Sequence, residues 1–238
     1  MSGQTPERPA ARTGAHSARR MTSREMARIA SPGCEGCGIC CRGMGDTIRL
    51  DPMDVWRLTA ALGAPFSDLL DRVIGLHAEE GLVLPHMRMD GATDACALLG
   101  EDGRCSLHAS RPGICRLFPL GREYEGETFR YFFPEEGCPR QDLRKVRICD
   151  WIGLPEIDRY ERFVGKWHAL VRRQQALAGK AIASGHDEWA RRRAMQLLQD
   201  FYTADFGVTE DDFYRTFEAI CGEKPWSRPS RDGGQVES

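Results

Sequence analysis

Four cysteines lie within eight residues near the start of the chain, in the segment GCEGCGICCRG at residues 33–43. Their spacing is C-x2-C-x2-C-C, and so dense a group of thiols can form disulfides, a redox relay or a metal site. The four residues are Cys34, Cys37, Cys40 and Cys41. Six more follow downstream: Cys96, Cys105, Cys115, Cys138, Cys149 and Cys221.

The composition of the chain argues against disulfides. With 238 residues, 41% of them hydrophobic, the chain can bury a core without covalent staples. No apolar run has the length of a secretory signal or approaches the roughly 18 residues of a membrane span. We therefore predict a cytoplasmic protein that does not associate with membranes. Thiols stay reduced in that compartment, where clustered cysteines more often bind metal.

Glycine and charge both favour a metal. The glycines at 33, 36 and 38 allow the tight turns that direct neighbouring thiolates at one centre. Several thiolates in one place repel each other, and a bound cation removes that repulsion. Nearby arginines can offset the remaining negative charge: Arg42, Arg111, Arg116 and Arg122.

The residues leave the metal open. In ferredoxins a C-x2-C-x2-C run supplies three ligands to one iron–sulfur cluster and a distant cysteine supplies the fourth, so Cys34, Cys37 and Cys40 could act as such a set. Cys41 would then face a second site or pack elsewhere. A structural zinc instead takes four cysteine or histidine ligands, and the chain has enough of them for two zinc sites. The predicted cofactor is thus an iron–sulfur cluster or zinc.

Four segments together resemble the YkgJ-like family of cysteine-cluster proteins, which are described as zinc- or iron-chelating. The segments are CEGCGICC at 34–41, CALLGEDGRC at 96–105, CSLHASRPGICRLFP at 105–119 and EEGCPR at 135–140. Two positions depart from the family pattern. His108 stands where tyrosine is common, which favours packing over ligation, and Arg140 stands where glycine is common.

The resemblance implies a set of site residues and leaves the reaction open. Arg111 and Arg116 match the family's second signature and are assigned to cofactor binding. Flagellin lysine N-methylases carry a related cysteine set, so a metal-dependent enzyme is the alternative function. The metal ligands that the resemblance implies are Cys34, Cys37, Cys40, Cys41, Cys96, Cys105, Cys115 and Cys138.

Helix and strand signals flank the cysteines. Asp51 and Pro52 are typical of a helix start and Gly63 of its end, which predicts a helix within 51–63. Apolar spacing predicts a second helix over 65–81. Short strands are expected at 47–51, 82–89 and 128–133. After Trp151 the spacing indicates three helices, around 160–171, over about 187–203, and after a Thr209–Asp212 capping box.

These signals predict an α+β protein in which an irregular cysteine-rich metal-binding domain with short strands packs with a C-terminal helical segment. Cys221 has helical apolar neighbours and is expected in the core, and Cys149 is interpreted in the same way. The predicted parts are a disordered basic tail over 1–32, the cysteine-rich domain over 33–150, the helical segment over 151–222 and a disordered tail over 223–238.

The predicted partner is a metal ion or cluster. The net charge of −2 argues against a nucleic-acid partner, because only the first residues of the chain are basic. The sequence indicates no particular protein partner.

Overall fold

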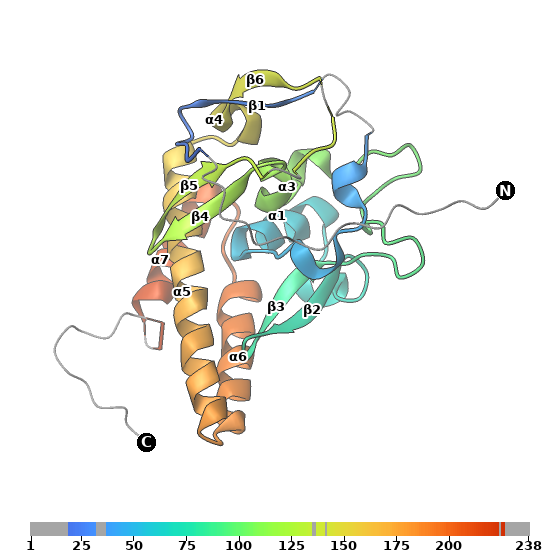
Figure 1. Cartoon of the computed structure of the whole chain (residues 1–238). Helices are drawn as coiled ribbons and strands as arrows, with labels where there is room; N and C mark the ends of the chain where they lie inside the picture. Colours follow the sequence, from blue (N-terminus) through green and yellow to red (C-terminus); the bar gives the residue numbers. More distant parts are fainter. Residues whose placement is uncertain (1–18, 32–36, 135–136, 141, 224, 227–238) are drawn as a thin grey trace.

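The computed structural model describes residues 19–31, 37–134, 137–140, 142–223 and 225–226. It has the predicted α+β class: short strands and short helices form the cysteine-rich part, and long helices form the C-terminal part (Figure 1). In the described residues the helices are α1 (Pro52–Leu62), α2 (Phe66–Leu69), α3 (Gly113–Leu117), α4 (Ile148–Ile152), α5 (Ile157–Ala183), α6 (Asp187–Tyr202) and α7 (Glu210–Gly222). None of these helices has the length and apolar character needed to cross a membrane.

Three antiparallel strand pairs accompany the helices in the part of the chain that the structure describes. They pair β1 (Met26–Ala30) with β6 (Arg144–Arg147), β2 (Ile74–Glu79) with β3 (Leu82–Met87), and β4 (Gly121–Glu125) with β5 (Thr128–Phe132). The β2–β3 hairpin turns through Glu80 and Gly81, which both have positive φ, as a two-residue hairpin loop requires. A Cβ at Gly81 would lie 2.9 Å from the Cβ of Ala178, so glycine lets this turn approach α5.

Local capping signals account for two of the correctly predicted helices. Asp51 caps α1 and forms a capping box with Asp54, and α1 ends at Gly63, which has φ 61°. Thr209 and Asp212 form the same reciprocal pair of hydrogen bonds at α7. Each box gives partners to N–H groups that have none within the helix. The strand predicted at 128–133 and the strand predicted at 82–89 are confirmed as β5 and β3.

The helix predicted over 65–81 is wrong. Only α2 is helical there, and the chain reverses at Asp71, whose φ is 59°. Residues 74–79 then pair with 82–87 as β2. The apolar residues matched a helical period, but their pairing with β3 decides the structure. The strand predicted over 47–51 is reduced to one bridge, between Arg49 and His86.

The two tails predicted to be disordered contain ordered residues. Residues 19–31 include β1, the Met21 N–H donates to the carbonyl oxygen of Tyr131 at 2.8 Å, and Ile29 is 1% exposed. At the other end Trp226 is buried, and its Nε1 donates to Asp200 at 2.7 Å. The prediction is therefore wrong for these residues, because their partners lie far away in the sequence. Residues 1–18, 32, 224 and 227–238 of these tails lie outside the described part.

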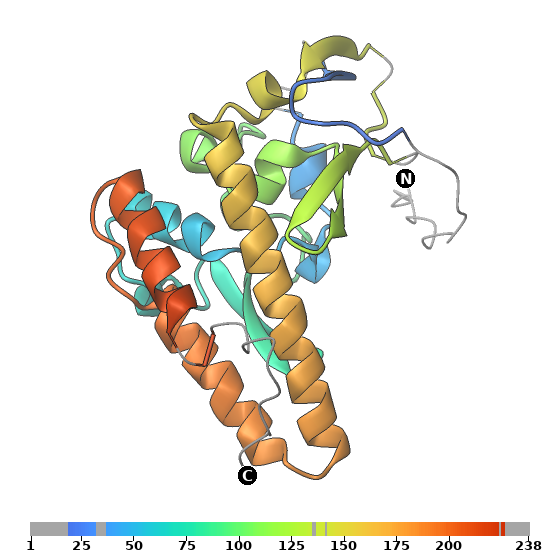
Figure 2. The ribbon, with the colours of Figure 1, turned by 90° about the vertical axis from the view of Figure 1, so that its left-hand side faces the viewer.

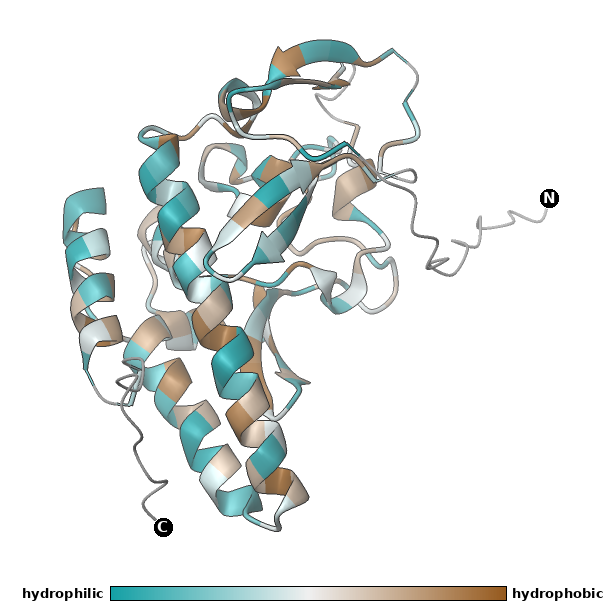
Figure 3. Ribbon diagram, turned by 60° about the vertical axis from the view of Figure 1, so that its left-hand side comes forward, coloured by the Kyte–Doolittle hydropathy of each residue, from teal (hydrophilic) through white to brown (hydrophobic). Residues whose placement is uncertain are grey.

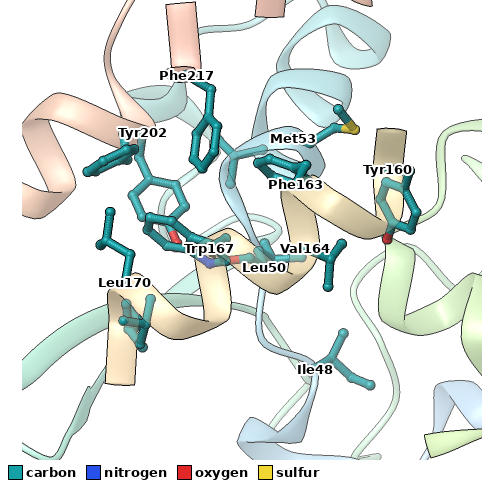
Figure 4. Packing of buried hydrophobic residues seen from close by; sticks show 14 of the residues in the cluster. Ile48, Leu50, Met53, Tyr160, Phe163, Val164, Trp167, Leu170, Tyr202 and Phe217 are labelled. Atoms are coloured by element: carbon teal, nitrogen blue, oxygen red, sulfur yellow. Dashed lines mark hydrogen bonds between the residues drawn. The ribbon is translucent and has the colours of Figure 1, made fainter. Parts of the chain in front are cut away.

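One hydrophobic core serves both halves of the molecule. Along α5 hydrophobic and hydrophilic residues alternate with the helical turn (Figure 3), and α6 runs beside α5 (Figure 2). The apolar face of α5 carries Phe163 and Trp167, which pack with Leu50 and Met53 from the cysteine-rich part (Figure 4). Tyr202 of α6 donates its hydroxyl hydrogen to the Leu50 carbonyl at 2.9 Å. The core thus contains residues from both sides of the domain boundary predicted between residues 150 and 151. The division into two domains stays a prediction.

Gly113 is the point where α3 comes closest to α5. A Cβ built at Gly113 would lie 1.9 Å from the Tyr160 hydroxyl oxygen and 3.1 Å from its ring carbon Cζ. Tyr160 is 1% exposed and cannot turn away into solvent. Glycine is required here because it leaves room for the tyrosine hydroxyl.

This contact predicts that Gly113→Ala destabilises the protein by about 1–3 kcal/mol, the usual cost of overpacking. Tyr160→Phe removes the atom that clashes most, so the double variant should lose less free energy of unfolding than the sum of the two single losses. Urea denaturation of the wild type, the two single variants and the double variant gives the loss of unfolding free energy for each variant. Additive losses would show that the hydroxyl does not limit this position.

Candidate metal centre

Seven of the eight cysteines predicted to bind metal line one cavity of about 440 Å³. They come from three parts of the chain, around residues 37–41, 96–115 and 138, and are Cys37, Cys40, Cys41, Cys96, Cys105, Cys115 and Cys138. The eighth, Cys34, lies outside the described residues. None of the nine described cysteines forms a disulfide. The fold therefore gathers the thiols whose spacing suggested a shared site.

A glycine turn places the first of these cysteines. Gly38 has φ 63° and precedes a 3₁₀ turn at Ile39–Cys41, in which the Cys41 N–H donates to the Gly38 carbonyl at 3.0 Å. A Cβ at Gly38 would lie 3.2 Å from the Gly103 carbonyl oxygen, which leaves little room for a side chain. The turn brings Cys40 and Cys41 to the same cavity.

Backbone hydrogen bonds bring the second segment against the first. The Cys96 N–H donates to the Cys41 carbonyl at 2.8 Å, and the Gly43 N–H donates to the Asp94 carbonyl at the same distance. The chain then returns through a bridge between Leu99 and Cys105. These contacts fix the backbones of Cys41, Cys96 and Cys105 relative to one another. Cys115 reaches the cavity from α3.

The third segment contributes a cation as well as a thiol. Arg140 lines the cavity, and its Nη1 lies 3.8 Å from the Cys37 sulfur. Its Nε donates to the Ser31 hydroxyl at 2.7 Å and to Asp142 at 3.3 Å, which ties residues 137–140 to the end of β1. From the sequence, Arg140 was noted only because it stands where glycine is common in the family, and no role was predicted for it. Its contact with Cys37 depends on the packing of β1, which the sequence did not reveal.

The thiols act on one another through charge. A hydrogen bond from the Cys41 thiol lowers the pKa of Cys40 to about 6, and the same bond, together with burial, raises the pKa of Cys41. Burial raises the pKa of Cys115, and the charges of Asp54 and other cavity cysteines raise it further. Burial also raises the pKa of Cys96. Most of these thiols thus resist ionisation until a cation joins them.

The two predicted arginines have different surroundings. Arg111 lines the cavity, contacts His108 through Nη1, and has a buried Nε without a hydrogen-bond partner in the described part of the chain. Arg116 does not line the cavity. Its guanidinium donates to the carbonyl oxygens of Ala109, Arg111 and Ile152, which secures the loop before α3. Its cofactor-binding role stays a prediction.

Two cysteines lie away from the cavity. Cys221 is 6% exposed in α7, as its apolar neighbours predicted, and burial raises its pKa to about 12. Cys149 is half-buried at the edge of the core, and its sulfur lies 3.5 Å from a carboxylate oxygen of Asp150. Neither is among the cavity's lining residues.

The donor types fit a soft metal such as zinc or iron, because thiolate sulfur is the ligand that such metals take in proteins. A tetrahedral zinc would hold its sulfurs about 3.8 Å from one another. Within the described ranges no three Cys, His, Asp or Glu side chains converge so closely on one point.

Comparison with known proteins supports the same chemistry. Residues 33–139 match the family model CxxCxxCC, which is described as "Putative zinc- or iron-chelating domain". Comparisons with curated proteins and with solved structures find no match. The matched range covers every cysteine that lines the cavity. Over residues 33–139 the chain is therefore similar to the CxxCxxCC family, in agreement with the cysteine-cluster resemblance of its sequence.

Proposed function

We propose that the cavity binds an iron–sulfur cluster through cysteine thiolates and that the protein takes part in one-electron redox chemistry. The observation that carries the proposal is the convergence of seven cysteines, from three parts of the chain, on one cavity. A reducing cytoplasm, the compartment that we propose from the sequence, would keep these thiols available.

The number of thiols supports a centre with several metal atoms. A single structural zinc takes four ligands, whereas seven described cysteines line this cavity. Its volume of about 440 Å³ also exceeds what one ion needs, since a water molecule accounts for about 30 Å³ of liquid. A cluster bridged by inorganic sulfide spreads its ligands over a larger space than one ion does.

Five cysteines form the set that we assign to the cluster. Cys40, Cys96, Cys105 and Cys115 each lie close enough to another thiol of this set for their charges to raise its pKa, and Cys41 hydrogen-bonds to Cys40. An iron–sulfur cluster needs four cysteine ligands, so this set suffices. Cys37 lies beside Arg140, and we assign it, with Cys138, to the outer wall of the site.

The walls of the cavity suit a buried anionic centre. They include Ile48, Met87 and Trp151, and among the described lining residues there is no Asp or Glu. Arg104, Arg111 and Arg140 line the same cavity and would neutralise part of the charge of four thiolates. When bound, the cluster would supply reversible transfer of one electron. The chain's own part is to hold the sulfurs, exclude water and offset the charge.

Zinc is the second candidate, because the cysteines join segments that have little regular structure. Residues 88–112 contain only one short helical turn and isolated bridges. A zinc ion would staple this region to the turn at 37–41, as it does in small zinc domains. Zinc has no redox chemistry, so it would make the site a scaffold.

Anaerobic purification followed by an absorption spectrum and by iron, zinc and sulfide counts separates the two candidates. We expect a broad absorption band at about 400 nm, with iron and sulfide in equal amounts. A colourless protein with stoichiometric zinc would contradict the iron–sulfur proposal and support the scaffold. A protein with neither metal would contradict both.

Single substitutions test the ligand set. Cys96→Ser and Cys115→Ser should each lower the metal content by at least about twofold, because a hydroxyl replaces a thiolate ligand. Cys221→Ala is the matched control, since it removes a buried thiol that lies away from the cavity. Metal analysis of the proteins purified side by side gives the result. An unchanged metal content in both serine variants, or a loss in the control, would overturn the assignment.

A further inference from the structure

A buried carboxylate lies behind the cysteine cavity. Asp54 belongs to α1 and is 3% exposed. Its Oδ1 accepts a hydrogen bond from the Gly113 N–H at 2.7 Å, and its Oδ2 accepts one from the Asp51 N–H at 3.1 Å. Asp54 therefore connects the start of α1 to the start of α3, 59 residues later.

The helix α3 needs this connection. It has five residues, and Pro112 precedes it without any side-chain cap. The first N–H groups of a helix have no partner within the helix, and a buried N–H without a partner is costly. The Asp54 carboxylate satisfies the N–H of Gly113, the first helical residue, with a charge-assisted bond.

A second side chain lies against Gly113. The Tyr160 hydroxyl lies against it, so that even a methyl group at Gly113 would clash. That hydroxyl accepts a hydrogen bond at 3.3 Å from Arg122, whose guanidinium lies over the rings of Tyr160 and Phe129. Gly113 thus lies close to both a carboxylate on α1 and a phenol on α5. Cys115 follows two residues later, on the same helical turn.

We infer that Asp54 is a positioning residue, which holds α3 so that the Cys115 thiol reaches the metal centre. The inference rests on the proposed function, because it takes Cys115 as a ligand. Metal sites tolerate deviations of only about 0.2 Å in ligand distance, so a small shift of α3 weakens binding. Asp54 itself would not touch the metal and would act only through the placement of Cys115.

A double-mutant cycle tests this. The rate at which metal is released to a chelator is measured for the wild type, Asp54→Ala, Cys115→Ser and the double variant, all purified anaerobically. Asp54→Ala should raise the rate at least about tenfold in the wild-type background, as loss of an outer-shell partner typically does. In the Cys115→Ser background the same change should raise it less than about twofold, because there is no ligand left to position.

The outcomes separate this inference from the proposed function. If Asp54→Ala raises the rate by the same factor in both backgrounds, Asp54 only stabilises the fold and the inference is overturned, while Cys115 remains a ligand. If Cys115→Ser releases metal as the wild type does, the ligand assignment fails and the inference fails with it. Asp46→Ala is the control, since Asp46 is an exposed aspartate whose ion pair is with His77. Its rate should match the wild type.

A conservative variant covers the case in which Cys115→Ser holds too little metal to measure. Asp54→Asn keeps an oxygen that can accept the Gly113 N–H but cannot serve both of the present donors. It should release metal more slowly than Asp54→Ala, by at least about threefold. Equal rates for the two variants would overturn the inference.

Discussion

Repulsion between crowded thiolates is the constraint on which the rest of the structure depends. Cys40, Cys41, Cys96 and Cys115 shift one another's pKa values, and burial adds to the cost of ionising most of them. Left alone, such a cavity would open or keep its protons. A bound metal removes the repulsion, and the arginines of the wall reduce the charge that remains. The scaffold must nevertheless hold the thiols together before the metal arrives.

That scaffold consists largely of contacts outside the cysteine segments. Leu50 and Met53 pack among aromatic side chains of α5 and α7, which anchors α1. From α1, Asp54 reaches the start of α3, and the Tyr160 hydroxyl of α5 lies against Gly113. The long helices therefore do more than cover a small metal domain. Through Tyr160, α5 also contacts the start of the helix that carries Cys115.

The sequence predicted features that depend on neighbouring residues and missed those that depend on distant ones. The capping boxes at Asp51 and Thr209 are complete within four residues, so α1 and α7 could be predicted. The strand pair β1–β6 joins residues more than a hundred positions apart, and nothing local marks it. For the cavity, spacing and resemblance identified the cysteines. They could not indicate that Arg140 approaches Cys37, or that Arg116 binds backbone carbonyls, because tertiary packing sets those directions.

Because the cavity and the core share residues, metal affinity and folding stability are linked. A metal that binds only the folded chain stabilises it, and by the same linkage any change that favours the arrangement around α3 strengthens metal binding. This linkage depends on the particular contacts that hold α3, and not on the overall free energy of unfolding. If Asp54 positions α3 as inferred, a change at Asp54 would alter both the stability of the fold and the placement of Cys115. The contacts of Asp54 and Tyr160 with Gly113 thus link the packing of the core to the helix that carries Cys115.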